Sequence, residues 1–286
     1  MKLNDVLSKI DNEISTSNSL PDNFELTDEA KKAYELILSH TPVTFITGRA
    51  GTGKTTFIQY LRNVYKGNLV VLAPTGMTAI NIKGQTIHSF FRFPPRTFED
   101  DEISNNYNKI IDQINMIIID EVSMVQSDVI DHMDFALRKW KKNQVAFGGV
   151  QLVLVGDCFQ LSPWIKFGAE KKRFETKYKS QWFFDAHVLQ NIEFEPINFT
   201  KIFRQKDPDF IRVLNRLRIN RYSDNDIQYI NDICFNNKNI DQEQIILTTV
   251  NEHADNLNKI ELDKLNSEIR KYNAKKVNMI TEEITK

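Results

Sequence analysis

The sequence predicts a parallel α/β fold, and three observations predict it. Four short apolar runs rich in β-branched residues lie between residues 43 and 156, as is typical of strands buried on both faces. Segments of helical periodicity separate these runs, and alternation of strand with helix indicates a parallel sheet. A match to G-x-x-x-x-G-K-[ST] at residues 48–55 falls where the first run ends and a helical pattern begins.

The elements of the first half follow in alternation. A helix is expected behind Thr27, with Ala33, Leu36 and Ile37 on one face. Strands are expected at residues 43–47, 69–73, 116–120 and 151–156, and helices at residues 52–65 and 127–142. The segment from 91 to 113 contains a Pro-Pro pair and an acidic run. It is too long for an ordinary connection between core strands, so we interpret it as a small inserted subdomain or functional loop.

The second half is expected to begin another α/β domain. A loop rich in lysine and aromatic residues is expected at residues 165–184. A weaker cycle follows, with strands near 192–200 and 245–250 and helices near 207–218, 224–235 and 253–265. The predicted division is therefore an N-terminal segment 1–23, a first domain 24–192 and part of a second domain 193–286.

Composition limits the possible partners and locations. The 286 residues carry 37 Lys plus Arg against 38 Asp plus Glu, a formal net charge of -1, so a site for a polyanion must be local. The two cysteines, Cys158 and Cys234, do not form a disulfide framework or a zinc pattern. The first twenty residues lack the apolar core of a secretion signal, and no apolar stretch approaches the roughly 20 residues of a membrane span. A cytoplasmic protein without a membrane segment is expected.

The glycine-rich match at residues 48–55 predicts a P-loop. Glycines let backbone N–H groups wrap a phosphate chain at a helix N-terminus, where a lysine reaches the β and γ oxygens and a hydroxyl binds Mg²⁺. A chance glycine-rich turn is the alternative, which the flanking strand and helix oppose. The candidate nucleotide-binding residues are Gly48, Ala50, Gly51, Thr52, Gly53, Lys54, Thr55 and Thr56.

Two further strands are expected to end in polar residues at the same edge. The apolar run 117–119 is followed by Asp120 and Glu121, the pattern of a Walker B motif. Asp120 is expected to hold Mg²⁺ and Glu121 to orient and deprotonate the attacking water. Surface acids that cap the following helix are the alternative. Asp157 and Gln160 follow the fourth strand and are expected to face the γ-phosphate, so the three stretches together indicate nucleoside triphosphate hydrolysis.

More particular stretches accompany these motifs. They are A-P-T-G and G-x-T-I-H-S-F-F within residues 72–91, G-D-C-F-Q-L-S-P at 156–163, and F-R-Q at 203–205 followed by L-N-R-L-R at 214–218. In their order and in their residues they resemble the motifs of the Pif1 family of superfamily 1B DNA helicases, from about residue 24 to about residue 265. RecD-like and Dda-like helicases share the T-I-H element and are the nearest alternatives.

The resemblance implies a fold and an activity. It implies a RecA-like domain with residues 91–113 as a wedge subdomain, followed by part of a second RecA-like domain. The implied activity is that of an ATP-dependent 5′-to-3′ DNA helicase, with ATP and Mg²⁺ as cofactors and single-stranded DNA, forks and duplex junctions as partners. A monomer that works in DNA repair, recombination, replication or telomere maintenance is expected, associated with the nucleoid if the source is bacterial.

The resemblance also implies roles for individual residues. Lys54, Asp120 and Glu121 are expected to be catalytic, with Thr55 and Asp120 as Mg²⁺ ligands. Gln160 is expected to couple the γ-phosphate to DNA, and Arg204 to reach the phosphates from the second domain; an ordinary surface arginine is the alternative for Arg204. The residues expected to touch single-stranded DNA are Thr75, Thr86, His88 and Phe90.

Several interpretations stay open at this stage. His88 and Phe90 have a structural role in the core as their alternative. The run 171–179 either supplies positive potential for DNA or is a solvated loop, and residues 138–142 are expected to be an exposed helix face. The family carries an adenine-reading glutamine where this chain has Ala30, so the resemblance does not extend to base selectivity. Residues 264–286 show none of the family's later motifs, so a nucleotide- and DNA-binding module without unwinding activity is the alternative function.

Overall fold

The computed structural model describes residues 20, 25–94, 103, 109–165, 168–236 and 245–265. The chain forms two compact units, residues 1–223 and residues 224–286, and each is described by itself. Most of the predicted insertion at 91–113 lies outside the described residues. In the part of the chain that is described, no helix has the length and apolarity that a bilayer crossing requires.

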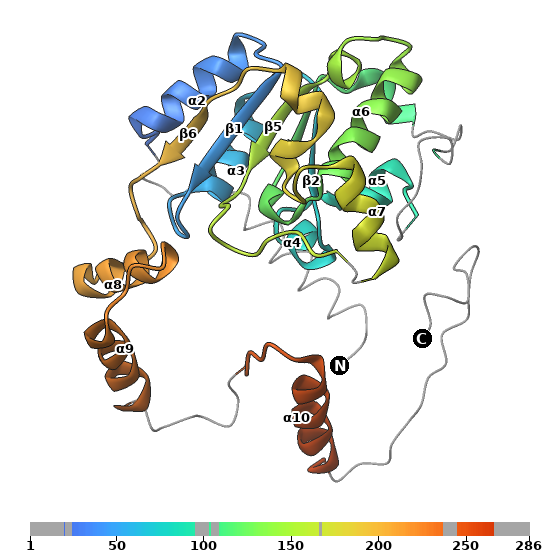
Figure 1. Ribbon diagram of the computed structural model, residues 1–286. Coiled ribbons are helices and arrows are strands. Elements are labelled where there is room, and N and C mark those ends of the chain that lie inside the picture. Colours follow the sequence, from blue (N-terminus) through green and yellow to red (C-terminus); the bar gives the residue numbers. More distant parts are fainter. Residues whose placement is uncertain are drawn as a thin grey trace. The chain divides into compact units, whose positions relative to one another are not determined.

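The first unit is built on one parallel sheet, which confirms the predicted fold class (Figure 1). The strand order is β3-β2-β4-β5-β1-β6, and every neighbouring pair is parallel. The carboxyl ends of all strands therefore meet at one edge of the sheet, where α/β folds bind their ligands. The strands are β1 (Val43–Gly48), β2 (Leu69–Ala73), β3 (Gln85–Thr86), β4 (Met116–Ile119), β5 (Gln151–Val155) and β6 (Pro196–Phe199).

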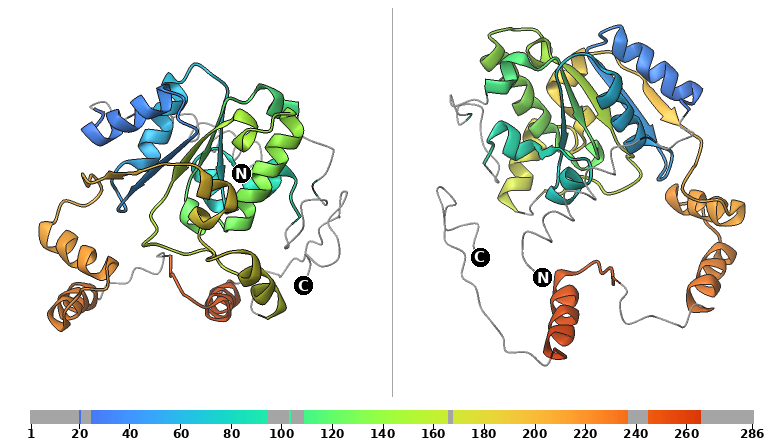
Figure 2. Two further views of the ribbon diagram at one scale, coloured as in Figure 1. Left: turned by 45° about the horizontal axis from the view of Figure 1, so that its top comes forward. Right: turned by 180° about the vertical axis from the view of Figure 1, so that it is seen from behind.

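Helices cover both faces of this sheet, as Figures 1 and 2 show. One face carries α2 (Asp28–Leu38), α3 (Lys54–Val64) and α4 (Gly76–Asn81), and the other carries α5 (Ile87–Phe91) and α6 (Ser127–Lys141). The other α-helices among the described residues of the first unit are α7 (Ala169–Lys177) and α8 (Pro208–Arg218). The 3-10 helices are η2 (Lys109–Gln113), η3 (Val122–Met124), η4 (Ala146–Gly149), η5 (Phe183–Asp185) and η6 (His187–Asn191). The second unit contains α9 (Asp224–Asn236) and α10 (Asn251–Asp263).

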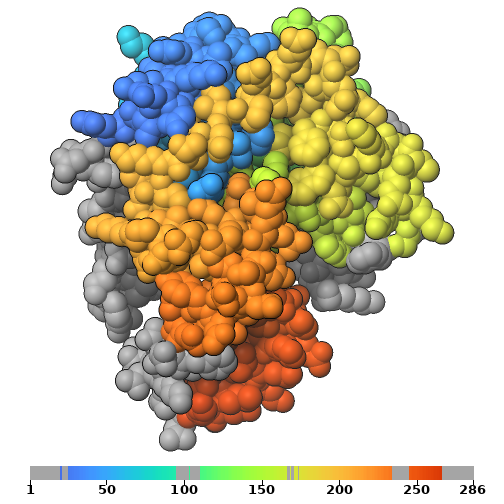
Figure 3. Space-filling model, turned by 60° about the vertical axis from the view of Figure 1, so that its left-hand side comes forward, coloured from blue at the N-terminus to red at the C-terminus, as the bar shows by residue number. Residues whose placement is uncertain are grey.

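Strand β6 lies in the first sheet and not in a second one. The sequence-based division assigns the strand near 192–200 to a second domain, but β6 pairs with β1 from Pro196 to Phe199. Its alternate residues Ile197 and Phe199 are buried against the cluster that contains α2, because side chains of a strand alternate between its faces. In the space-filling view the blue surface of α2 adjoins the gold surface around β6 (Figure 3).

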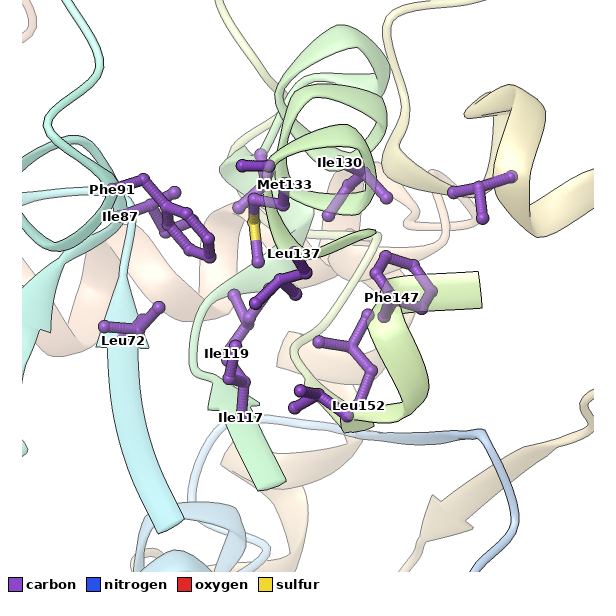
Figure 4. Close-up of a cluster of buried hydrophobic side chains, with 14 of the residues drawn as sticks. Leu72, Ile87, Phe91, Ile117, Ile119, Ile130, Met133, Leu137, Phe147 and Leu152 are labelled. Atoms are coloured by element: carbon purple, nitrogen blue, oxygen red, sulfur yellow. The ribbon is translucent and has the colours of Figure 1, made fainter. Parts of the chain in front are cut away.

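The core consists of two apolar layers, one on each face of the sheet. Along β4, Ile117 and Ile119 point toward α6, whereas Met116 and Ile118 point toward α2 and α3. Figure 4 shows the first of these layers, with Met133 and Leu137 of α6 facing the strand. Because β4 is buried on both faces, its sequence is a continuous apolar run, as the prediction requires.

Two local predictions are wrong, and a third is wrong in part. Residues 245–250 form no strand, and within 165–184 residues 169–177 form a helix, whose Phe174 is buried. In the run 138–142, Lys139 and Lys142 are exposed as expected, but Trp140 is buried and Lys141 is half-buried. Lys139 donates to the carbonyl of Ile103, and Lys141 donates to three carbonyls between residues 111 and 114. For Lys139 and Lys141, contacts to distant backbone decide where the side chains lie.

Candidate functional site

The predicted P-loop connects β1 to α3 at the carboxyl edge of the sheet. Gly53 precedes the first helical residue and adopts φ +87°, and Gly51 adopts φ +78°. Glycine adopts such left-handed conformations without steric penalty. At Gly48 a Cβ would also lie 2.6 Å from the carbonyl oxygen of Phe199, so β6 allows no side chain there. The glycines of the motif are therefore required both by the loop conformation and by the strand next to it.

Lys54 lies across the loop that precedes it. Its Nζ donates to the carbonyl oxygens of Gly48 at 2.7 Å and Arg49 at 3.1 Å. Burial lowers the pKa of this amine from its ordinary value, and the negative charges of Asp157, Glu121 and Asp120 act against that shift. The loop therefore holds the Lys54 amine where a bound phosphate chain would contact it. The negative charges of the three carboxylates stabilise its positive charge.

Asp120 and Glu121 follow β4, two strands from the P-loop strand in the sheet order. The Asp120 side chain is buried, and its Oδ1 accepts a 3.0 Å hydrogen bond from the backbone N–H of Glu121. Burial, followed by the charge of Glu121, raises the pKa of Asp120 to about 6. Glu121 has φ +52°, a left-handed conformation that costs a non-glycine residue energy and often marks functional sites.

Asp120→Asn is expected to raise the free energy of unfolding of the metal-free protein at pH 7 by up to about 3 kcal/mol, the equivalent of its pKa shift. Folded Asp120 holds a proton that the unfolded chain releases, so between about pH 4 and pH 6 stability falls as the pH rises. Above pH 6 the cost of the buried charge is complete, and the neutral amide avoids it. Urea unfolding of the parent protein and of Asp120→Asn at pH 4 and at pH 7 measures the difference in the free energy of unfolding. Equal stabilisation at pH 4 and pH 7 would contradict this explanation.

The loop after β5 carries Asp157 and Gln160. Because β5 lies between β1 and β4 in the sheet, this loop follows the strand between the P-loop strand and the strand of Asp120. The backbone N–H of Gln160 donates to the carbonyl oxygen of Asp157 at 2.9 Å, and its side-chain amide donates to Asp157 Oδ2 at 3.3 Å. Gln160 itself is exposed, whereas the side chain of Asp157 is 1% exposed. The Gln160 side chain is therefore exposed to solvent, and the buried Asp157 carboxylate accepts a hydrogen bond from its amide.

The segment that follows β6 closes over the P-loop. The backbone N–H of Phe203 donates to the carbonyl oxygen of Gly51 at 2.8 Å. A Cβ added to Gly51 would lie 2.6 Å from the Cβ of Arg204, so this glycine also permits the close approach of the two segments. Lys201 Nζ lies 5.1 Å from the centre of the Phe203 ring. Arg204 thereby reaches the P-loop from a segment about 150 residues later in the chain.

These parts surround one cleft, with a volume of about 580 Å³. All five residues predicted to be catalytic line it, together with residues 50–56 of the P-loop; Gly48 lies at the start of the loop. The lining residues are Glu25, Leu26, Thr27, Ala30, residues 50–57, Asp120, Glu121, Gln160, Phe199, Lys201, Phe203 and Arg204. A larger cavity of about 970 Å³ involves Pro42 and Gln151, at the amino ends of β1 and β5, and contains none of the predicted site residues.

The residues expected to touch DNA lie at the β3 end of the same sheet edge. Thr75 and Thr86 cap α4 and α5, because their hydroxyls accept hydrogen bonds from the N–H groups of Thr78 and Ser89. His88 is partly buried, and burial lowers its pKa, so its ring is neutral at pH 7. Phe90 is 3% exposed and packs edge-on against Phe91. Its ring is covered by protein, so the structure contradicts base stacking by Phe90 and supports the core alternative.

The donor set in the cleft fits Mg²⁺. A hydroxyl at Thr55 and a carboxylate at Asp120 are hard oxygen ligands, and Mg²⁺ is usually held by few protein groups together with phosphate oxygens and water. The raised pKa of Asp120 indicates a buried carboxylate that a cation would stabilise. Among the described residues there is no group of three or more His, Cys, Asp and Glu arranged to hold a metal ion, which a site of this kind does not need.

Three further residues around the site are not predicted from the sequence. Lys201 and Phe203 line the cleft, and Arg218 forms an ion pair with Asp157. Phe203 and Arg218 belong to the F-R-Q and L-N-R-L-R stretches, which therefore contained a usable signal. Their contacts could not be read from spacing, because they join segments that are far apart in the chain.

The chain is similar to known proteins in both sequence and fold. The sequence model of the PIF1-like helicase family matches residues 25–228. ATP-dependent DNA helicase PIF1 of Saccharomyces cerevisiae (strain YJM789) is 34% identical over 192 residues, which are 63% of this chain and 21% of that protein. A structure of two coordinating Pif1 helicases at forked double-stranded DNA superimposes with a TM-score of 0.76 at 34% identity. Pif1 helicase from Bacteroides, solved with ADP-AlF3 and single-stranded DNA, superimposes with a TM-score of 0.74 at 35% identity.

The structural matches cover 84% and 87% of this chain, and 58% and 59% of the two solved chains. The chain thus spans about a fifth of the length of the yeast relative and less than three fifths of either solved helicase. The matched residues 25–228 contain the P-loop, the Asp120–Glu121 pair, Gln160 and Arg204, and the parallel sheet agrees with the RecA-like domain that the resemblance implies. The chain belongs to the PIF1-like helicase family.

Proposed function

We propose that this protein acts as an ATP-dependent DNA helicase that moves 5′ to 3′ on single-stranded DNA. The observation that carries the proposal is the cleft in which the P-loop, two carboxylates, Gln160 and Arg204 meet. Family membership supports DNA as the polymer that the hydrolysis serves. Work at forks and duplex junctions, in repair, recombination or telomere maintenance, is part of the same proposal.

The phosphates of ATP are expected to bind along residues 50–56. Backbone N–H groups at the start of α3 point at such a chain, and the helix dipole adds positive potential. In the ATP-bound protein Lys54 exchanges its hydrogen bonds with the carbonyls of Gly48 and Arg49 for bonds with the β and γ oxygens. The exchange keeps the amine partnered in both states.

Hydrolysis needs a base, a cation and a contact to the γ-phosphate. Glu121 is the base that takes the proton of the attacking water, since it lines the cleft beside Asp120. Arg204 neutralises the charge that develops on the transferring phosphoryl group. Thr55 and Asp120 would hold Mg²⁺, which when bound would neutralise further charge on the phosphate oxygens. Gln160 touches the γ-phosphate from the exposed side of the cleft.

DNA is expected to cross the carboxyl edge of the sheet near Thr75, Thr86 and His88. Ala73 of β2 is in register with Thr86 of β3, and Thr75 follows two residues after Ala73, so both caps lie at the carboxyl ends of neighbouring strands. Hydroxyl groups position phosphates, and a neutral histidine donates a hydrogen bond without adding charge. Such contacts agree with a chain whose net charge is -1.

The proposal is tested by ATP hydrolysis with and without oligonucleotides. We expect single-stranded DNA to increase hydrolysis several-fold, and an unfolded polypeptide to have no effect. Hydrolysis that DNA does not stimulate would refute the helicase assignment, and stimulation by polypeptide would indicate a protein-directed ATPase. Forked duplexes with a 5′ or a 3′ loading strand then test direction. Separation dependent on the 5′ strand supports the proposal, whereas DNA-stimulated hydrolysis without separation supports the binding-module alternative.

A further inference from the structure

The last residue of helix α8, Arg218, binds Asp157 in the loop that follows β5. Its Nη2 donates to Asp157 Oδ1 at 2.7 Å, and its Nε donates to Asp157 Oδ2 at 3.1 Å. A guanidinium that binds both oxygens of one carboxylate fixes its orientation, which a single hydrogen bond does not. The Arg218 side chain is 22% exposed and that of Asp157 is 1% exposed, so this ion pair is shielded from water. It is therefore not one of the solvated surface pairs that contribute little.

The Asp157 carboxylate also binds two other groups of its own loop, the loop that follows β5. Its Oδ1 also accepts from the backbone N–H of Phe159 at 3.1 Å, and its Oδ2 accepts from the side-chain amide of Gln160 at 3.3 Å. The Arg218 guanidinium covers the Phe159 ring, 4.1 Å from its centre. One carboxylate thus binds three partners at once, and two of them belong to the loop that presents Gln160 to the cleft.

The electrostatics of Asp157 depend on the arginine. Burial acts to raise the pKa of Asp157, but the hydrogen bonds from Arg218 and from the Phe159 N–H outweigh it, and its pKa lies below the ordinary value. A buried carboxylate that loses its cation either takes up a proton or moves toward water. The first change weakens the acceptor that the Gln160 amide uses, and the second moves it away.

We propose that Arg218 is a positioning residue, which acts through Asp157 to hold the Gln160 side chain toward the γ-phosphate. The inference rests on the proposed ATP hydrolysis and assigns a role to a residue outside the cleft lining. It also gives α8 a function. This helix is the last element of the first compact unit, which ends at residue 223, so the ion pair joins the loop of Gln160 to the chain that leads into the second unit.

The test is a double-mutant cycle between positions 218 and 160, read as kcat and KM for ATP with saturating single-stranded DNA. Arg218→Ala is expected to lower kcat about 10- to 100-fold, the scale of a misplaced catalytic group, with KM changed less than about twofold. Arg218→Lys is expected to recover little, because an ammonium does not bind both carboxylate oxygens. In a Gln160→Ala background, Arg218→Ala should have no further effect on kcat, because Arg218 acts through Gln160.

Arg212→Ala is the matched control. Arg212 lies on the same helix and pairs with Asp209 at 2.7 Å, but both side chains are more than 60% exposed. We expect its kcat to equal that of the parent protein. The inference would be overturned if the loss of kcat in the double variant equalled the product of the two single losses. An unchanged kcat in Arg218→Ala would overturn it as well. Thermal unfolding of each variant separates a loss of fold from a loss of positioning.

Failure of the proposed function gives a different result. If the parent protein hydrolyses no ATP, the proposed function fails, and the inference is then read from binding alone. The ratio of affinities for ATPγS and ADP reports contact with the γ-phosphate. Arg218→Ala and Gln160→Ala should lower this ratio by the same factor, and a ratio unchanged by Arg218→Ala would refute the positioning role.

Discussion

Lys54→Ala is expected to lower kcat for ATP hydrolysis at least about 100-fold, the loss that follows removal of one preorganised donor to developing charge. The structure places the Lys54 amine over its own loop, within hydrogen-bond distance of two carbonyl oxygens, so its position is set before ATP arrives. Alanine removes both the charge and the donor, and the affinity for ATP should fall as well. Steady-state hydrolysis and titration with a fluorescent ATP analogue measure the two effects.

A control variant separates this loss from a change in fold. Lys31→Ala removes a lysine of α2 that pairs with Asp28 on the exposed surface, and its hydrolysis should match that of the parent protein. Lys54→Ala should unfold at a temperature close to that of the parent, because burial without a full counter-charge already lowers the pKa of Lys54. Hydrolysis at more than a tenth of the parent rate would rule out the role assigned to Lys54.

Arg204→Ala is expected to lower kcat about 1,000-fold, the lower end of the effect of a cation supplied to the transferring phosphoryl group. The affinity for ADP should change little, because the charge that Arg204 meets develops in the transition state. The backbone of this segment is held by the bond from the Phe203 N–H to Gly51, and alanine does not disturb that bond. Single-turnover hydrolysis and ADP titration check both statements.

Lys206→Ala is the control for charge in the same segment. Lys206 lies two residues after Arg204 and is not among the residues that line the cleft, so its removal should leave kcat unchanged. A similar loss in both variants would indicate a general effect of positive charge. Unchanged kcat in Arg204→Ala would favour the ordinary surface arginine that the sequence left open.

The parts of the site that the sequence predicts well are contiguous in the chain. The P-loop is one segment, and its glycines, lysine and hydroxyls are set by a strand that ends at Gly48 and a helix that begins at Lys54. Asp120 follows a four-residue apolar strand in the same way. Such units are recognisable because periodicity and turn residues determine them locally.

Predictions that need knowledge of a packing partner are less successful. Phe90 is an aromatic residue beside a candidate DNA contact, and only its burial against Phe91 shows that its ring is covered. The lysines at 139 and 141 belong to a charged run, and their carbonyl partners come from an earlier part of the chain. Such contacts join segments that are far apart in the chain, so local sequence patterns do not predict them.

The sequence by itself determined the parallel α/β class, the P-loop and the pair of carboxylates after β4, because each depends on neighbours in the chain. Tertiary structure alone decided the strand order, which sets β5 between β1 and β4 and so brings Asp157 between the P-loop and Asp120. It also decided that β6 completes the first sheet and that Arg218 pairs with Asp157 across 61 positions. Hydrogen bonds between strands and the cost of burying a lone charge select those partners, and both act between segments that the sequence separates.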